Sequence, residues 1–266
     1  MTLVLERLRV AYRDRVVVDA ITAELAHAGQ LVALVGANGA GKSSTLRAIA
    51  GLSPMQGRAL LDGEDLVHMR PARRLQRVAY MPQSLPQASG LTVYEAVLGT
   101  LQIACGHWSA RQMHERIAHV LSALGLEPLA MRALATLSGG QRQMAGLAQL
   151  LARNARLLLL DEPTSALDLR WQLQLLQALR VHVQHHQTLC VLAVHDLNLA
   201  ARWCDRMVVL ADGEVLANGA PLEVLTPALL HRAYAVHARV ERCSSGFPVV
   251  LVDGTDVVST VKECAQ

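Results

Sequence analysis

The sequence predicts an α/β protein with a mostly parallel sheet core, an N-terminal antiparallel β subdomain and an inserted α-helical subdomain. Two unbroken apolar runs, residues 31–35 and 157–160, are typical of strands that are covered on both faces, as in parallel sheets. Between these runs lies a block of helical segments with no strand inside it, and after residue 157 strand and helix patterns alternate. A parallel core interrupted by a helical insertion is the simplest architecture with this order.

The segments before the helical block are expected to be mainly strands. Their ranges are, in order, residues 3–10, 16–23, 31–35, 58–61 and 77–81. The first two alternate in part between apolar and polar residues, which is typical of a two-sided sheet. One helix is expected among them, from Lys42 to about residue 50, because Gly51 and Pro54 then stop the pattern.

The helical block and the alternating region complete the chain. Helical spacing marks residues 93–102, 110–124 and 140–153. Strands are then expected at 157–160 and 188–194, and helices at 170–184 and 197–203. Asp212-Gly213 is a strong turn signal between strands 206–210 and 214–217. Beyond about residue 237 the pattern predicts strands 248–252 and 257–261, hinged near Asp253-Gly254.

Composition favours a cytosolic protein. The chain has 266 residues, of which 52% are hydrophobic, so it can bury a core without a disulfide or metal. Its five cysteines are scattered and include no C-x-x-C pair, which suits a reducing compartment. The sequence contains no run of eighteen apolar residues, so no membrane-spanning helix is predicted. The charged N-terminus argues against export. A net charge of +3 does not call for nucleic acid as a partner.

A glycine-rich segment after the first buried strand fits the pattern G-x-x-x-x-G-K-[ST] over residues 36–43. Its glycines would let backbone N–H groups turn inward around phosphate oxygens at a helix N-terminus. Lys42, one of only two lysines in the chain, would reach the β- and γ-phosphates, and Ser43 would ligate Mg²⁺. We expect the phosphates to be bound by Gly36, Asn38, Gly39, Gly41, Lys42, Ser43 and Ser44. This cradle predicts a P-loop, RecA-like nucleotide binder, while the alternative is a ligand-free turn.

Two carboxylates follow the second buried strand. Leu157 to Leu160 deliver Asp161 and Glu162 to the C-terminal end of that strand, where open α/β sheets bind ligands. We expect Asp161 to hold Mg²⁺ through water and Glu162 to polarise the attacking water. Two adjacent acids would repel a triphosphate without a metal between them. The alternative is a surface turn favoured by Pro163.

Further motifs identify a family resemblance. Residues 137–141, Leu-Ser-Gly-Gly-Gln, lie before the Asp161-Glu162 pair and resemble the signature of ATP-binding cassette (ABC) ATPases, the motor subunits of ABC transporters. Gln83 resembles the Q-loop glutamine of that family, residues 165–168 resemble its D-loop, and His195 resembles its switch histidine. The resemblance implies an ABC ATPase domain over residues 1–240, with the helical subdomain inserted at about 84–155. Residues 241–266 would be a short β-like extension without assigned chemistry.

The resemblance implies ATP and Mg²⁺ as cofactors and a head-to-tail homodimer that encloses two ATP molecules. Each signature would face the γ-phosphate held by the other copy, through Ser138, Gly139, Gly140, Gln141 and Asp168. A hydroxyl and exposed N–H groups at a helix start offer an anion site on physical grounds alone. A helix cap without a ligand is the alternative.

The resemblance also assigns catalytic roles. Glu162, His195 and Gln83 would be catalytic, and the imidazole of His195 would contact the γ-phosphate. Without the motif, His195 would be interpreted as a core histidine and Gln83 as a loop residue. The metal would be held by Ser43, Gln83 and Asp161. Tyr12, in a chain of only eight aromatic residues (three Trp, four Tyr, one Phe), would stack on adenine, with a plain strand tyrosine as the alternative.

Some residues depart from the family pattern or stand outside it. Met144 and Gln149 occupy positions where the family commonly has arginine, and they are expected to affect contact with a partner rather than ATP chemistry. His182 and His186 are spaced i, i+4 and could chelate a metal, although a solvated helix end is the more common origin of such a pair.

The resemblance implies a transport role. Because one cassette occurs without a membrane span, separate permease subunits would form a transmembrane dimer, and this protein would dock peripherally on the cytoplasmic face of a bacterial inner membrane. Residues 195–202 and the segment through 219–227 are similar to importers for iron-siderophores, haem and cobalamin. Iron chelate or haem is the expected cargo, delivered by a periplasmic substrate-binding protein, with cobalamin as the alternative. A soluble ABC ATPase acting on DNA or ribosomes and a P-loop kinase are the rival classes.

Overall fold

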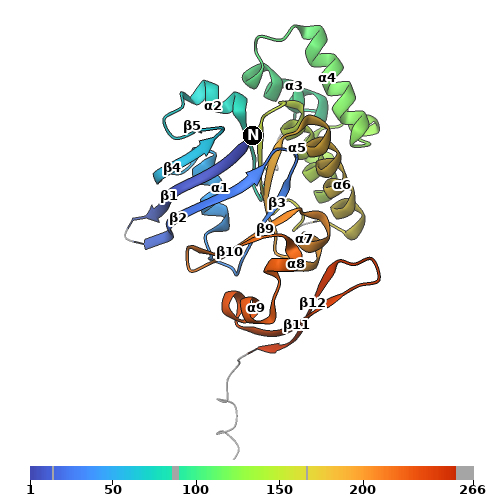
Figure 1. The fold of residues 1–266 in the computed structure, drawn as a ribbon. Coiled ribbons are helices and arrows are strands. Elements are labelled where there is room, and N and C mark those ends of the chain that lie inside the picture. Colours follow the sequence, from blue (N-terminus) through green and yellow to red (C-terminus); the bar gives the residue numbers. More distant parts are fainter. Residues whose placement is uncertain (14, 86–89, 166, 256–266) are drawn as a thin grey trace, which may run out of the picture.

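The computed structural model describes residues 1–255 apart from 14, 86–89 and 166. A mostly parallel sheet lies at the centre, an antiparallel sheet lies beside it, and a block of helices extends from one end (Figure 1). This architecture confirms the predicted fold class. Within the described ranges, no helix combines the length and the apolar character that crossing a membrane requires.

The N-terminal sheet is antiparallel, with strand order β2-β1-β4-β5. Its strands are β1 (Thr2–Tyr12), β2 (Arg15–His27), β4 (Gln56–Leu61) and β5 (Glu64–Asp65). In β1 the buried residues are Leu3, Leu5, Leu8 and Val10. The alternation of buried and more exposed positions is therefore displaced by one residue between Leu5 and Leu8. The shift coincides with an irregularity in pairing to β2 near Arg7, whose φ is 51°. This bulge explains why the alternation in the sequence is only partial.

The central sheet has the order β10-β9-β3-β8-β7-β6. Its strands are β3 (Leu31–Val35), β6 (Val78–Met81), β7 (Leu157–Asp161), β8 (Leu189–Ala193), β9 (Arg206–Ala211) and β10 (Glu214–Gly219). All neighbours pair in parallel except β9 and β10, which form a hairpin through Asp212-Gly213. Every residue of β3 and β7 is buried, which confirms the interpretation of both apolar runs.

Two hydrophobic cores cover the two faces of this sheet. In β3, Leu31 and Val35 face the core formed with the helical block, whereas Val32 and Leu34 face the core formed with the N-terminal sheet and α1 (Lys42–Ile49). Because successive strand residues point to opposite faces, a strand buried on both sides shows no polar alternation. The loops that follow the C-terminal ends of these strands therefore start from a sheet that is packed on both faces.

The helical block contains α3 (Val93–Ala104), α4 (Ala110–Ala123) and α5 (Gly139–Ala152), with short 3₁₀ turns at Glu127–Leu129 and Leu134–Thr136. Thr92, Ser109 and Ser138 cap the three helices, each in a reciprocal capping box with the residue three positions later. Two further helices pack on the sheet, α6 (Leu169–His186) and α7 (Leu197–Trp203). Asp168 and Asp196 cap them through side-chain oxygens.

Three short helices were not predicted: α2 (Pro71–Arg77), α8 (Pro221–Val224) and α9 (Pro227–Tyr234). None of the residues of α2 is buried, so the sequence carries no apolar period there. Each of the three has proline in its first turn, where the missing N–H costs no hydrogen bond. The expected strand 77–81 accordingly begins one residue later, at Val78.

The C-terminal hairpin differs from its prediction. Strands β11 (Val236–Arg242) and β12 (Pro248–Thr255) pair around a turn at residues 243–247, where Gly246 has a φ of 83°. Asp253-Gly254 therefore lies inside β12, and the expectation of a hinge there was wrong. The other predicted strand, 257–261, lies outside the described residues. Asn198 of α7 fastens the hairpin, because its amide exchanges hydrogen bonds with Val250 N and O at 2.7 and 3.2 Å.

Candidate functional site

The glycine-rich loop forms a tight cradle between β3 and α1. A side chain at Gly36 would collide with the carbonyl oxygen of Leu210, and one at Gly41 would lie 2.9 Å from the carbonyl oxygen of Val17. Gly41 also has a φ of 98°, a conformation that L-residues rarely adopt. Both glycines are therefore required by the fold of the loop. Asn38 and Gly39 form its exposed crest.

Lys42 begins α1 and folds back across the cradle. Its Nζ donates to the carbonyl oxygens of Gly36 and Ala37 at 2.7 and 3.0 Å. The side chain is only 5% exposed. Burial lowers the pKa of Lys42, and the charges of Glu162 and Asp161 oppose that shift. The ammonium thus bridges two carbonyl oxygens of the cradle and lies within reach of the charges of Asp161 and Glu162.

Asp161 ends β7 beside the first turn of α1. Its Oδ1 accepts a hydrogen bond from Ser43 Oγ at 2.8 Å, and its Oδ2 accepts one from Tyr80 OH at 3.2 Å. Burial, followed by the charge of Asp161, raises the pKa of Tyr80, so the phenol remains a proton donor. The sequence analysis did not single out Tyr80 as a site residue. It reaches Asp161 because β6 and β7 are neighbours in the sheet.

Glu162 follows in a strained backbone conformation, with a φ of 49°. Its Oε2 accepts from Gln83 Nε2 at 2.6 Å, and its Oε1 lies 2.5 Å from His195 Nε2. Three residues from three loops, each after a neighbouring strand of the central sheet, thus meet at one carboxylate. These are the three residues to which the sequence analysis assigned catalytic roles, and the structure brings them together.

The signature segment lies at the start of α5. Ser138 Oγ accepts from Gln141 N at 3.3 Å, and Gln141 Oε1 accepts from Ser138 N at 3.1 Å. Ser138 and Gly139 are exposed. Among the described residues, no hydrogen bond joins Ser138, Gly139 or Gln141 to the cradle. The structure therefore does not bring these signature residues to the cradle of the same chain.

Trp171 supports the signature from α6. A Cβ at Gly140 would lie 2.8 Å from Trp171 Cδ1, so the indole packs directly against this glycine. Trp171 N donates to Asp168 Oδ1 at 2.9 Å, which connects the same residue to the D-loop-like segment. Ala166 of that segment lies outside the described residues. Sequence reasoning missed Trp171, although aromatic residues are rare in this chain.

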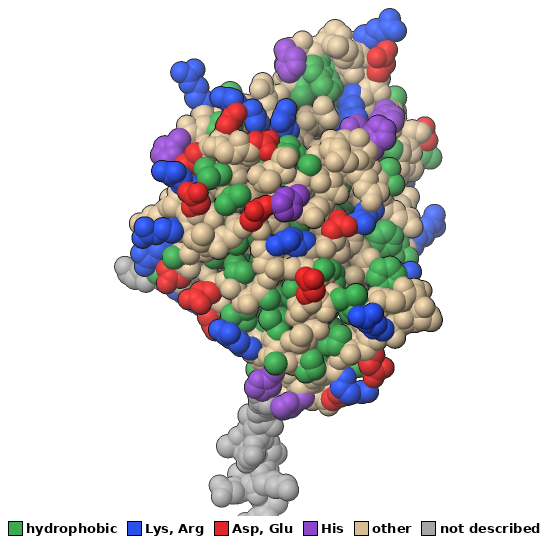
Figure 2. All heavy atoms as spheres, in the orientation of Figure 1, with side chains coloured by type: hydrophobic (Ala, Val, Ile, Leu, Met, Phe, Trp, Pro, Cys, Tyr) green, Lys and Arg blue, Asp and Glu red, His purple; other side chains and the backbone are tan. Residues whose placement is uncertain are grey.

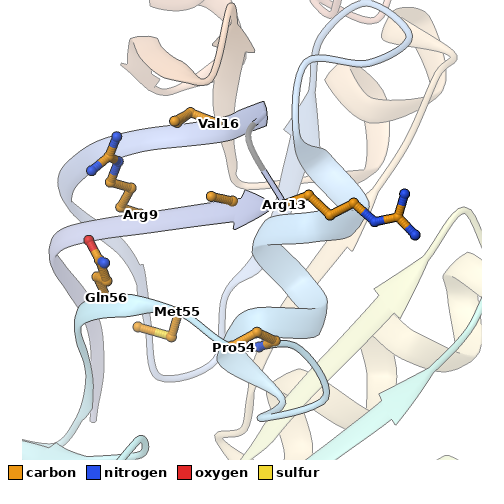
Figure 3. Close-up of a pocket in the computed structure, with 7 residues that line it drawn as sticks. Arg9, Arg13, Val16, Pro54, Met55 and Gln56 are labelled. Atoms are coloured by element: carbon orange, nitrogen blue, oxygen red, sulfur yellow. The ribbon is translucent and has the colours of Figure 1, made fainter.

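Tyr12 lies at the end of β1 and is 43% exposed. Its hydroxyl is 3.4 Å from Ser53 Oγ, and hydrogen bonding to Ser44 and Ser53 lowers its pKa. A cavity of ≈ 310 Å³ is lined by its neighbours Ala11 and Arg13 and by residues 54–56, but not by Tyr12 itself (Figure 3). Figure 3 shows Arg13 extending from the end of β1 toward α1, away from Arg9. Tyr12 is thus placed next to the cradle helix, with its ring accessible.

The residues that depart from the family pattern have structural roles. Met144 is fully buried in the core of the helical block. Gln149 Oε1 accepts from Thr100 Oγ1 at 3.2 Å, joining α5 to α3. Directly before Met144 in the same helix, Gln143 is buried and donates to the carbonyl of Pro163 at 3.1 Å. Sequence reasoning missed this contact, which links α5 to the loop carrying Glu162.

The fold and these residues define a class: a P-loop nucleotide-binding cassette with two acids at the end of β7 and a helical insertion. The family model described as "ABC transporter" matches residues 21–165, which is more than half of the chain. The chain belongs to the ABC transporter family. Membership implies that it binds ATP and is an ATPase coupled to transport.

Curated relatives and solved structures agree with this assignment. The ferric enterobactin transport ATP-binding protein FepC of Escherichia coli is 32% identical over 96% of this chain and 95% of its own. The hemin import ATP-binding protein HmuV of Pseudomonas entomophila is 40% identical over 84% and 89%. The cobalamin import ATP-binding protein BtuD of Halobacterium salinarum is 38% identical over 80% and 54%. A solved ATP-binding subunit of an ABC transporter is 27% identical, with a TM-score of 0.75 over 84% of this chain and 92% of the other.

Proposed function

We propose that this chain is the motor subunit of an ABC importer that binds and hydrolyses MgATP at a head-to-tail homodimer interface. The main support for this proposal is that the side chains of Gln83 and His195 both contact the carboxylate of Glu162 beside the cradle. A carboxylate between an amide and an imidazole, next to a P-loop lysine, fits hydrolysis of a terminal phosphate.

Nucleotide binding would replace contacts that the chain now makes with itself. The phosphate oxygens of ATP would take the place of the Gly36 and Ala37 carbonyls as acceptors for Lys42. Backbone N–H groups of the cradle and of the first turn of α1, which includes Ser43 and Ser44, would donate to the same phosphates. The exposed ring of Tyr12, beside Ser44, would stack on the adenine.

The residues around Asp161 fit a magnesium ion. Ser43 Oγ and Asp161 Oδ1 are hard oxygen donors 2.8 Å apart, and Gln83, which contacts the adjacent Glu162 through its Nε2, has an amide oxygen as a further hard donor. When bound, Mg²⁺ would neutralise charge on the phosphates. Tyr80 would keep its hydrogen bond to Asp161 Oδ2 and so orient the carboxylate toward the cradle.

Hydrolysis needs a base and an oriented water. Glu162 would accept the hydrogen bond of the attacking water once Gln83 and His195 turn toward the nucleotide. His195 Nε2, now against Glu162, would then contact the terminal phosphate. Gln83 and His195 now contact the two oxygens of Glu162, so they would have to release the carboxylate before it could accept a hydrogen bond from the water.

The second half of each site would come from another copy of the chain. Ser138 and Gly139 are exposed at the N-terminus of α5, which presents N–H groups and a positive dipole end. Ser138, Gly139, Gly140 and Gln141, with Asp168 nearby, would close over the phosphates held by the partner. Two ATP molecules would then be enclosed between two copies.

We assign residues 1–240 to the ATPase domain, 84–155 to its helical subdomain and 241–266 to a C-terminal extension. Gln83 and the start of the helical subdomain would meet a transmembrane permease dimer. The chain would then sit peripherally on the cytoplasmic face of the inner membrane, and a periplasmic binding protein would act on it indirectly. No nucleic acid takes part.

Iron chelate or haem is the proposed cargo, because relatives named for these cargoes match most of the chain. Cobalamin is the alternative that a relative also favours. Deletion strains supplied with a ferric siderophore, haem or cobalamin as the limiting nutrient distinguish these cargoes. A non-transport ABC ATPase remains the rival class, and recovery of the tagged protein without any permease after detergent extraction would favour it.

The central experiment replaces Glu162 by Gln. We expect ATP binding to be retained and hydrolysis to fall by about 100-fold or more, because the water loses its base. Phosphate release and nucleotide binding are measured on the same preparation, with Glu127→Gln, in the 3₁₀ turn at Glu127–Leu129, as the matched control. Unchanged turnover in Glu162→Gln would refute the assigned role.

A further inference from the structure

A second cavity, of ≈ 500 Å³, lies between α4 and α6 and shares no lining residue with the nucleotide cradle. Part of its wall is apolar and includes Val120, Leu124 and Ala178. One end is lined by the guanidinium of Arg116 and by imidazoles from both helices. Figure 2 shows histidine and basic side chains gathered on the corresponding part of the surface, over α4 and α6. A cavity of this size is in the range of small-molecule sites.

His182 is a buried polar residue without a hydrogen-bond partner. It lines the cavity and is only 9% exposed. Its Nε2 is fully buried and, within the described part of the chain, accepts and donates no hydrogen bond. Burial, assisted by the neighbouring His186 and Arg116, lowers the pKa of His182 to about 3, so the ring is neutral. Because this nitrogen is buried, it does not open into the cavity, and His182 contributes a neutral ring to the wall.

The charge around this cavity has one sign. Arg116 is fixed at its edge because its guanidinium donates to the carbonyls of Leu151 and Ala152 at 2.6 and 3.2 Å. His119, His185 and His186 supply further nitrogen donors at the mouth, and the described lining residues include no Asp or Glu. No three metal-ligating side chains gather among the described residues, so the His182–His186 pair has no third ligand for a metal.

We propose that this cavity binds a small organic anion with an apolar body. The carboxylate would lie beside Arg116 and accept hydrogen bonds from the imidazoles of His119, His185 and His186, while the hydrocarbon part would contact the apolar residues of the wall and the neutral ring of His182. A guanidinium and several imidazole donors at one end of the cavity suit a carboxylate, because the charged group then has hydrogen-bond partners without being fully buried. The site is independent of the proposed ATP chemistry.

The test is calorimetric titration of the full-length, nucleotide-free protein with sodium decanoate below its aggregation concentration. We expect saturable one-to-one binding. Val181 is 66% exposed and lines the cavity, so its substitution does not threaten folding. Val181→Glu is expected to weaken binding by about 10-fold or more through charge repulsion, whereas the matched variant Val181→Gln changes it by less than about threefold.

Two further titrations identify the chemistry of the ligand. Decyltrimethylammonium has the same tail and the opposite charge, and we expect it neither to bind in the cavity nor to displace decanoate. Zn²⁺ alone is expected not to bind in a manner that depends on His182. The proposal is overturned if wild-type protein shows no saturable binding, if the Glu and Gln variants of Val181 bind equally, if the cationic amphiphile competes, or if Zn²⁺ binds through His182.

Discussion

Asp161 and Glu162 are adjacent in sequence and face different partners. Asp161 is 4% exposed and accepts hydrogen bonds from Ser43 and Tyr80, both of which stay fixed on regular elements. Glu162 meets Gln83 and His195, which belong to loops. A carboxylate held by helix and strand suits a permanent metal site, whereas one held by loop residues can be released. The two acids can therefore divide metal binding and water activation between them.

The contact between Tyr80 and Asp161 gives a prediction about stability. Tyr80→Phe removes a hydrogen bond to a buried carboxylate, so we expect the free energy of unfolding to fall by about 1–3 kcal/mol. Urea titration of the nucleotide-free protein measures the change. The control is Tyr94→Phe on α3, whose ring lies against His114 and away from Asp161. Equal stability of Tyr80→Phe and Tyr94→Phe would contradict the structure at this point.

At this scale, the sequence can indicate a site only where its residues are close in the chain. The cradle from Gly36 to Ser43 is one continuous segment, so its spacing alone indicates a phosphate site. Tyr80 and Gln143 were not found, because their partners Asp161 and Pro163 are distant in sequence or in a different loop. Their contacts depend on strand neighbours and helix packing, which no local pattern records.

Several residues of the candidate nucleotide site lie at the N-termini of helices. Ser138, Asp168 and Asp196 each cap a helix, and each begins or flanks a motif that the sequence analysis assigned to nucleotide chemistry. A capping side chain fixes the first turn, so the exposed N–H groups beyond it point in one direction. The short helices α2 and α9 escaped prediction because their few residues give little periodicity.

Gly140 provides a test of how α6 supports the start of α5. A methyl group at this position would lie 2.8 Å from the ring of Trp171, so Gly140→Ala should lower the free energy of unfolding by about 1–3 kcal/mol. Thermal and urea unfolding of the nucleotide-free protein measure this. Gly139→Ala is the matched control, because nothing lies within 4 Å of its Cβ position. The packing would be misassigned if both variants were equally stable.

The buried ring of His182 predicts how stability depends on pH. Its pKa is about 3 in the folded protein and about 6.5 when unfolded, so the unfolded state binds the proton first. The stability contributed by the neutral ring is present above pH 6.5 and is lost as the pH falls toward 3. Between pH 6.5 and pH 5 the loss should be about 2 kcal/mol. Urea titrations of wild type and His182→Gln test this, and identical pH profiles would contradict it.

The whole molecule is organised by two cores on one sheet. The spatial strand order β10-β9-β3-β8-β7-β6 brings the ends of β3, β6, β7 and β8 together, and the loops after them carry the candidate site. The sequence predicted that buried strands exist, because unbroken apolar runs mark them. It could not predict their order, which depends on pairing between distant segments. The C-terminal hinge was misplaced for a similar reason, since two turn signals competed and pairing between β11 and β12 selected the one near Gly246.

In the part of the chain that the structure describes, no hydrogen bond joins the cradle to the signature residues Ser138, Gly139 and Gln141. Ser138 and Gly139 face solvent, although the helix start they form is suited to an anion. The account therefore depends on a second copy of the chain, whose exposed helix start would complete the pocket.

A crystal structure of Glu162→Gln trapped with MgATP tests this dependence most directly. We predict two copies related head to tail, with each terminal phosphate contacted by Lys42 of one copy and Ser138 of the partner subunit. The contrary result would be a triphosphate fully enclosed by a single copy, with Lys42 bound to it and both Ser138 hydroxyls in solvent.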